Sequence, residues 1–362
     1  MRAVPCLVLF VLGVCGQQAA LLRRRSVPVI HVQGTHYEVG FDVGRTFASL
    51  IKEFLSTYEN LRDFEKQYRT EAGREAYEKT LANMRRRYPH YVREMQGVAD
   101  GAQVPFVQLF LLQMDDIIGT INENLVSRND SGGCSSIAFH SQANTYLGHT
   151  EDAFHETLNH FYIMSAHIIP TPEDKEAGAV EERFASLCYA GHLPGYTMGY
   201  NQHGLVFSIN TLSPHLLKPG ATPRTFITRA LLASKNFPDA ERILLDEGLA
   251  NGFSINMIWS GERGRSIHNV EVAPDPARDR SQLNVHQYDN DTLVHCNIYQ
   301  RLSTKQVIGP IIDSSEARLQ AIRAHAPPRQ LSDLTDILSD QSSRGFQVFS
   351  EKPDNVIQTI AA

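Results

Sequence analysis

The sequence predicts a layered α+β domain, because three parts of the chain carry different residue patterns. Residues 45–61 and 75–87 repeat apolar side chains at steps of three and four, as amphipathic helices do. After residue 134 the chain changes to short β-rich runs separated by turn residues. Helical patterns return over residues 223–248, and strand patterns resume after them. Helices and strands therefore come in groups, which favours an α+β over a strictly alternating arrangement.

Composition places the chain among ordinary globular proteins and bounds its partners. Its 362 residues are enough for one large domain or two ordinary ones. Hydrophobic residues make up 42% and charged residues 20% of the chain, as in folded proteins. The net charge of −6 disfavours nucleic acid as a partner, since a nucleic-acid binder presents a basic face.

The first twenty residues predict a secretory signal peptide. Arg2 precedes the apolar run "AVPCLVLFVLGVC", and small and polar residues follow it. Cleavage is expected after Gly16 or Ala20; the alternative is an uncleaved signal anchor, because Leu21 and Leu22 extend the apolar character. Elsewhere the sequence has no apolar stretch long enough to span a bilayer, so we expect no stable membrane contact. The expected location is the secretory pathway, ending outside the cell or in a lysosome-like lumen.

Cysteine usage points to a free thiol. Removal of the signal peptide takes Cys6 and Cys15 and leaves Cys134, Cys188 and Cys296. An odd, sparse set in a secreted protein is not a disulfide framework.

The elements follow in order along the chain. Residues 27–32 ("VPVIHV") are β-branched and predict a first strand, and the two helices already described follow it. Pro238 suits the first turn of the second helix in residues 223–248. Residues 274–281 predict a surface loop rather than a domain boundary. The strand-like runs are "SSIAF", "TYLGHT", "HFYIMSAHII", "FASLCYAG", "GLVFSIN", "FSINMIWSG" and "IHNVEVAP".

Cys134 stands in "RNDSGGCSSIAFH", after two glycines and before two serines. One interpretation is a small buried thiol at a turn leading into a strand. The other is a nucleophile that must first be cut free from the chain before it, so that its own α-amine serves as the base. An α-amine has a pKa of about 7.7–8.0, close enough to ambient pH to accept a thiol proton.

Several ordered motifs decide between these interpretations. The stretches "YPHYVREMQGVADGAQVPFVQLFLLQ", "GGCSS" with "YLGHTED", and "GHLPGYTMGYNQHGLVFSINTL" occur in that order. Together they resemble the acyl-CoA:6-aminopenicillanate acyltransferase family of N-terminal-nucleophile hydrolases. "CYAGHLPGYTMGYNQHGLVFSINTLS" and "TPRTFITRALLAS" are most similar to its arthropod branch, which hydrolyses β-alanyl-dopamine and carcinine.

That resemblance implies a four-layer αββα sandwich made as a precursor and cut between Gly133 and Cys134. Residues 21–133 would form the upstream segment, and residues 134–362 the downstream segment beginning with the nucleophile. The two fragments would remain associated. The segment "QGTHYEVGFDVG" would open the first helix; it is not a phosphate loop, because no Lys-Ser/Thr follows.

The resemblance also implies the site. Asp152 would orient and balance the charge of the new ammonium, and Asn210 would donate a hydrogen bond to the oxyanion. Arg229 matches the family's arginine, with Arg224 as the alternative. The family often has an aromatic residue where this chain has Glu151, and "VHCNIY" keeps only His295 and Asn297 of a late motif.

The functional hypothesis is an amidohydrolase that releases an amine from small N-acyl conjugates, N-β-alanyl dopamine or histamine among them. The alternatives are transfer of the acyl group to another amine and a catalytically silent secreted relative. The mechanism needs no cofactor, and no His, Cys and carboxylate set predicts a metal site.

Two further expectations concern single features. Relatives continue beyond "NVIQTIAA", so we expect a final sheet edge with unpaired backbone groups. If Glu151 faces the pocket, it would pair with the ammonium of a β-alanyl group; the alternative is a solvated strand residue.

Overall fold

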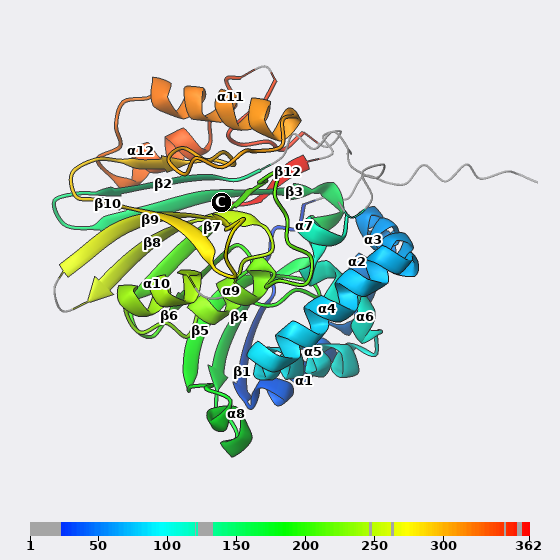
Figure 1. Cartoon of the computed structure of the whole chain (residues 1–362). Coiled ribbons are helices and arrows are strands. Elements are labelled where there is room, and N and C mark those ends of the chain that lie inside the picture. The colour runs from blue at the N-terminus through cyan, green and yellow to red at the C-terminus, as the bar shows by residue number, and fades with distance from the viewer. Residues whose placement is uncertain are drawn as a thin grey trace, which may run out of the picture.

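The computed structural model describes residues 23–119, 121, 133–245, 248–261, 264–343, 345–352 and 357–362. The predicted signal peptide and residues 122–132, directly before Gly133, lie outside the described residues. Two β-sheets face each other, and helices cover the outer face of each (Figure 1). The prediction of a four-layer αββα sandwich is confirmed.

The first third of the chain is helical, as its apolar spacing predicts. The predicted helix over residues 45–61 is broken at Phe47 and Tyr58, so that three helices share its pattern. The spacing runs on across the breaks because both aromatic side chains still face the core; Phe47 stacks on Tyr162 with ring centroids 4.1 Å apart. The helices are α1 (His36–Thr46), α2 (Ala48–Thr57), α3 (Glu59–Arg69), α4 (Glu71–Arg87), α5 (Pro89–Ala102), α6 (Phe106–Gln113) and α7 (Asp115–Ile118).

Helices α1 and α5 approach each other closely because both present glycines at their contact. A Cβ atom on Gly40 would lie 2.0 Å from the carbonyl oxygen of Glu94, and one on Gly97 would lie 2.2 Å from that of Tyr37. No larger side chain fits at either position. The glycine-rich segment opens the first helix, as expected. Its glycines allow α1 and α5 to pack closely.

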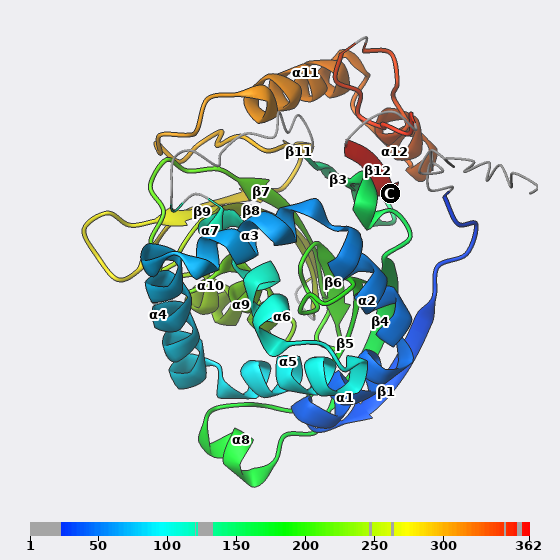
Figure 2. The same cartoon turned by 90° about the vertical axis from the view of Figure 1, so that its right-hand side faces the viewer.

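The larger sheet has eight strands in the order β1-β4-β5-β6-β7-β8-β9-β10. β1 pairs in parallel with β4, and all other neighbours are antiparallel. Helices α1 to α6 stand in front of this sheet in Figure 2. The strands are β1 (Val29–Gly34), β4 (Phe161–Ile168), β5 (Glu182–Tyr189), β6 (Met198–Asn201), β7 (Leu205–Leu212), β8 (Gly252–Gly261), β9 (Gly264–Pro274) and β10 (Ser281–Tyr288). Three further helices are α8 (Pro172–Glu176), α9 (Arg224–Leu231) and α10 (Phe237–Leu245).

The smaller sheet has the order β11-β2-β3-β12 and carries the site. Its strands are β2 (Ser135–His140), β3 (Thr145–Phe154), β11 (Leu293–His295) and β12 (Ile357–Ala361). Helices α11 (Pro310–Ala324) and α12 (Leu331–Leu338) cover its outer face through Leu319, Ile322, Leu334, Ile337 and Leu338. Cys134 immediately precedes β2, and Glu151 and Asp152 lie on the adjacent β3.

Strand β12 is an edge strand, as expected. It pairs with β3 on one side, and no other described strand pairs with its outer edge. That edge is nevertheless partly bonded: Arg23 donates to the carbonyls of Thr359 and Ile360, and the Thr359 amide donates to Ser350 O at 2.6 Å.

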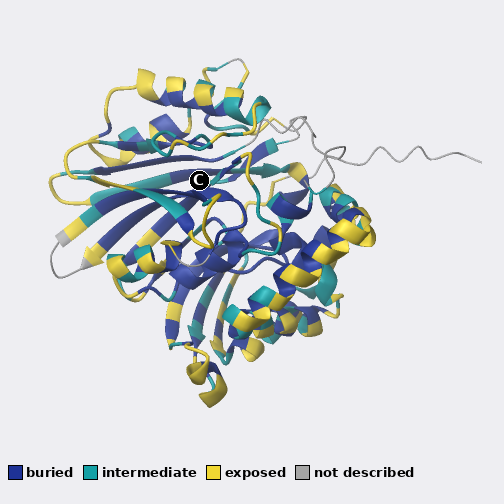
Figure 3. Ribbon diagram, viewed as in Figure 1, coloured by how far each residue is buried: buried dark blue, intermediate teal, exposed yellow. Residues whose placement is uncertain are grey.

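The two sides of the larger sheet differ in polarity. The side facing the helices holds the main apolar core, which includes Ile51, Phe54, Phe110, Phe207 and Phe253. Between the two sheets, buried polar side chains gather near Cys134: Ser136, His149, Ser208, Asn210, Asn256 and Asn269. Figure 3 shows buried residues along the strands, with exposed residues mainly on the outer helix faces and loops. Among the described helices, none combines the length and apolar character that a membrane crossing requires.

Candidate active site

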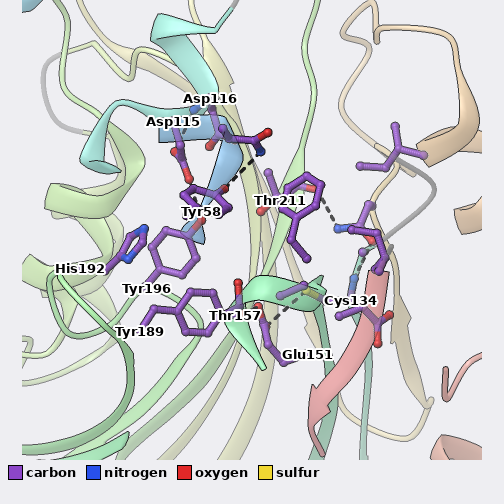
Figure 4. A pocket seen from close by; sticks show the side chains of 18 of the residues that line it. Tyr58, Asp115, Asp116, Cys134, Glu151, Thr157, Tyr189, His192, Tyr196 and Thr211 are labelled. Carbon is purple, nitrogen blue, oxygen red and sulfur yellow. Dashed lines mark hydrogen bonds between the residues drawn. The ribbon is translucent and has the colours of Figure 1, made fainter. Parts of the chain in front are cut away.

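A cavity of about 280 Å³ opens beside Cys134. Its wall is largely aromatic, with carboxylates at two places. Figure 4 shows Cys134 and Glu151 together, well apart from Asp115 and Asp116. The aromatic lining consists of Phe54, Tyr58, Phe64, Phe154, Tyr189, His192 and Tyr196.

The backbone of Cys134 is held on both sides by side chains from distant parts of the chain. Its amide nitrogen donates to Asn297 Oδ1 at 2.8 Å. Its carbonyl oxygen accepts from Asn210 Nδ2 at 2.9 Å and from the Arg318 guanidinium at 2.8 Å. A Cβ atom on Gly133 would lie 2.0 Å from Asn297 Oδ1, so only glycine fits before Cys134. The bond expected to be cut therefore lies in a tightly specified place.

The thiol of Cys134 lies against an acid. Its Sγ donates to Glu151 Oε2 across 3.4 Å, and the residue is only 6% exposed. Burial raises the pKa of the Cys134 thiol well above its ordinary value, and the charges of Glu151 and Asp152 raise it further. The thiol is therefore neutral in this arrangement and needs a base to become a nucleophile.

Glu151 belongs to a chain of hydrogen bonds between the sheets. Its Oε2 lies 2.9 Å from His149 Nε2, and its Oε1 accepts from the Tyr189 hydroxyl. On the other side of the ring, His149 Nδ1 lies 2.7 Å from Ser136 Oγ. Glu151 faces the cavity and is 5% exposed, so the alternative of a solvated strand residue does not describe it.

Asn210 ends a ladder of three asparagines on neighbouring strands. Asn269 Nδ2 donates to Asn256 Oδ1 at 2.7 Å, and Asn256 Nδ2 donates to Asn210 Oδ1 at 2.7 Å. Ser136 Oγ also donates to Asn210 Oδ1, at 3.0 Å. Because two donors occupy Oδ1, the amide must turn its nitrogen toward Cys134. The donor that the sequence predicts is thus oriented by residues that the sequence did not single out.

Asp152 lines the same cavity, from the β3 side. Its Oδ1 accepts from the Thr359 hydroxyl of β12 at 2.6 Å. Burial raises the pKa of Asp152 to about 7, although the Arg318 guanidinium and the Thr359 hydrogen bond oppose the rise. A carboxyl poised in this range readily becomes charged when a cation forms beside it.

The two arginines that the sequence proposed lie in different surroundings. Arg229 is fully buried; its guanidinium contacts Glu94 at 2.8 Å and Glu182 at 2.7 Å, and it is not among the described residues lining the cavity. Arg224 does line the cavity, where its Nε donates to Asp116 at 2.6 Å. The structure thus brings Arg224, and not Arg229, to the cavity.

The arginine that contacts Cys134 is Arg318, which sequence reasoning missed. Besides bonding Cys134 O, it donates to Asn297 Oδ1 at 2.9 Å. A signal was present, because Arg318 shares the buried stripe of helix α11 with Ser315, Leu319 and Ile322. His295, by contrast, contacts Glu271 at 3.1 Å, away from the thiol.

One group of side chains has spacing that a metal ion could use. The ligand-type atoms of Cys134, His149 and Glu151 lie within 4.8 Å of one another, the one such set within the described part of the chain. Because hydrogen bonds already join these atoms at 2.9 and 3.4 Å, we interpret the set as a proton-sharing network.

Comparisons with known proteins give a family and one near relative. The family model for acyl-coenzyme A:6-aminopenicillanic acid acyl-transferase matches residues 140–362. The β-alanyl-dopamine/carcinine hydrolase of Drosophila melanogaster is 45% identical over 349 residues, covering 94% of this chain and 90% of that protein. A solved structure, the Caenorhabditis elegans ortholog of N-acylethanolamine-hydrolyzing acid amidase, is 13% identical with a TM-score of 0.40. The match covers 59% of this chain and 88% of that one.

Proposed function

Because this chain belongs to the acyl-coenzyme A:6-aminopenicillanic acid acyl-transferase family, we propose that it hydrolyses small N-acyl amines. The proposed substrates are N-β-alanyl conjugates of dopamine or histamine, the class for which the Drosophila relative is named. The observation that carries the proposal is the position of Cys134, whose thiol meets an aromatic cavity while side chains fix its backbone.

The proposed mechanism begins with a cut between Gly133 and Cys134. The freed α-amine of Cys134 then takes the thiol proton, and the thiolate attacks the substrate carbonyl to form a thioester that water resolves. Asn210 would donate to the oxyanion, which in comparable sites contributes about 2.7–4 kcal/mol. Asp152 would pair with the ammonium form of the α-amine. The fragments 21–133 and 134–362 would stay together through the β1–β4 pairing and helix packing.

The cavity suits both ends of such a substrate. Aromatic side chains such as Tyr58, Phe154 and Tyr196 offer faces against which a catechol or imidazole ring can pack. Glu151 lies beside the thiol, within reach of the ammonium at the end of a short β-alanyl group. We therefore keep Glu151 as the proposed recognition residue for that ammonium in the cut enzyme.

The amino-terminal run of apolar residues supports entry into the secretory pathway, with an extracellular or lysosome-like destination. Secretion of the protein into the medium of expressing cells, with its chain cut after Gly16 or Ala20, would be the matching observation.

The function is tested by intact mass, amino-terminal sequencing and a panel of amides. We expect two fragments, with the downstream one beginning at Cys134, and release of amine from β-alanyl-dopamine and β-alanyl-histamine. Cys134→Ala should stay a single chain and be inactive. Formation of a new amide with an added amine, in preference to free acid, would identify an acyltransferase instead. An uncut protein that is fully active would exclude the mechanism, and a cut but inactive one would indicate a silent relative.

A further inference from the structure

Self-cleavage poses a problem that the mature reaction does not. In the uncut chain the nitrogen of Cys134 is an amide, which cannot accept a proton, so another group must deprotonate the thiol. We propose that Glu151 is that base, with His149 as the positioning residue that supports it. The inference rests on the proposed self-cleavage and adds a catalytic group to it.

The geometry selects Glu151 among the groups around the thiol. Its Oε2, 3.4 Å from Sγ, is the one side-chain acceptor that bonds this sulfur within the described ranges. Asp152 directs its Oδ1 to Thr359 instead, at 2.6 Å. Because burial keeps the Cys134 thiol neutral, its proton can be transferred only to an acceptor that already contacts the sulfur.

The hydrogen bonds fix the proton count of the pair. Ser136 Oγ has one hydrogen and lies near Asn210 Oδ1 at 3.0 Å, Ser208 Oγ at 3.1 Å and His149 Nδ1 at 2.7 Å. Asn210 Oδ1 can only accept, and when it receives the Ser136 hydrogen, Ser208 and His149 Nδ1 are the donors to Ser136. One further proton then lies between His149 Nε2 and Glu151 Oε2, 2.9 Å apart. The pair is neutral as a whole, and an imidazolium with a carboxylate is one of its two forms.

That form can take the thiol proton and balance the charge that results. The S–H bond breaks, the proton moves to Glu151 Oε2, and the thiolate is compensated by the imidazolium of His149. The sulfur lone pair attacks the Gly133 carbonyl carbon, and a tetrahedral oxyanion forms. When the C–N bond breaks, Glu151 returns the proton to the departing nitrogen of Cys134. The product is a thioester with a free α-amine, and one water then hydrolyses it to the Gly133 carboxylate and the thiol, while the α-amine takes up the proton released.

The role ends with the cut. The new α-amine is bonded to the same residue as the sulfur and takes over as base, which leaves Glu151 available to the substrate. The loss of Glu151 should therefore affect self-cleavage far more than turnover of an N-acetyl amide, which has no ammonium to recognise.

The first test follows self-cleavage of newly translated protein by gel and mass. We expect Glu151→Gln to slow the cut by about 100-fold or more, the usual scale for loss of a general base. Glu156→Gln is the matched control: Glu156 is also buried and lies 3.4 Å from a histidine nitrogen, that of His155, rather than from the thiol. The control should cut at the wild-type rate, and melting curves establish that both variants are folded.

Hydroxylamine locates the blocked step, because it cleaves thioesters. The Glu151→Gln protein should yield no hydroxylamine-dependent fragments, since its block precedes thioester formation. Once some of it has been cut by long incubation, the KM of the cut variant for β-alanyl amides should rise more than its KM for N-acetyl amides, because only the former carry an ammonium. Accumulation of a hydroxylamine-sensitive precursor, or a wild-type cutting rate, would overturn the assignment.

The pH profile tests His149. Cys134, Tyr189 and Asp152 also face Glu151 and are unchanged in His149→Gln, which still offers a donor to Glu151. We expect cutting to slow about tenfold and its acidic limb to move to higher pH, because the carboxylate loses its imidazolium. A slower rate with an unmoved profile would make His149 merely structural. If wild-type protein never cuts itself, the proposed function fails. If wild type cuts itself and the Glu151 and His149 variants cut at the same rate and with the same pH profile, this inference alone fails.

Discussion

Asp152 links the site to the pH dependence of folding. The perturbation is Asp152→Asn in a Cys134→Ala protein, which under the proposed mechanism stays a single chain. Burial raises the pKa of Asp152 from 3.8 to about 7. Between these values the folded protein keeps a proton that the unfolded chain releases, so stability falls as the pH rises. The stability linked to this proton is complete below about pH 4 and is lost as the pH rises through 7. At about 1.4 kcal/mol per pH unit, the change is about 4 kcal/mol.

The assay is urea unfolding at several pH values, followed by fluorescence of Trp259, the one tryptophan of the chain. The asparagine has no proton to lose and can still accept from Thr359. The free energy of unfolding of the Asp152→Asn variant, minus that of the Cys134→Ala parent, should therefore increase by about 4 kcal/mol from about pH 4 to pH 8. If the difference stays constant within about 1 kcal/mol over that range, the burial argument for Asp152 is wrong.

Three further changes address the ladder, the buried arginine and metals. Asn210→Ala should lower kcat per cut molecule by about 10²–10³-fold, whereas Asn256→Ala, which only orients Asn210, should cost less; equal losses would argue against a direct oxyanion contact. Arg229→Met should reduce the free energy of unfolding by about 3–5 kcal/mol, because Glu94 and Glu182 lose their buried partner, while activity per folded molecule is retained. Dialysis against EDTA should leave amine release unchanged, and a loss that zinc restores would show that a metal is needed.

Local patterns predicted the layers of the fold, because strong helical spacing and β-rich runs gave correct element types. Three residues named from short motifs, Cys134, Asn210 and Asp152, lie close together in the structure, and their catalytic roles stay predictions. Such patterns can mark a residue as buried, as the stripe of α11 does for Arg318, but they do not identify its partner far along the chain. Arg318 reaches Cys134 across 184 residues, and its helix was not predicted. Arg229 was chosen by its place in a motif, but its partners Glu94 and Glu182 come from other elements and hold it in the core.

Glu151 shows a second limit. Strand alternation alone suggests that neighbours such as Glu151 and Asp152 point apart, yet both line one cavity. The pairing of β12 with β3 shifts register between Thr359 and Ala361, directly opposite Asp152 and Glu151. Such an irregularity depends on the pairing of strands 207 residues apart, as the Thr359–Asp152 contact illustrates.

The parallel pairing of β1 with β4 has a consequence for the kinetic stability of the cut protein. It joins residues 29–34 to residues 163–168, on opposite sides of the proposed cut. Before the cut the two strands belong to one chain, so that their pairing costs only the entropy of closing the loop between them. Afterwards a fully unfolded enzyme would have to reassemble from two separate chains, at a rate that depends on dilution. The cut protein would then persist by the slowness of its unfolding rather than by repeated refolding.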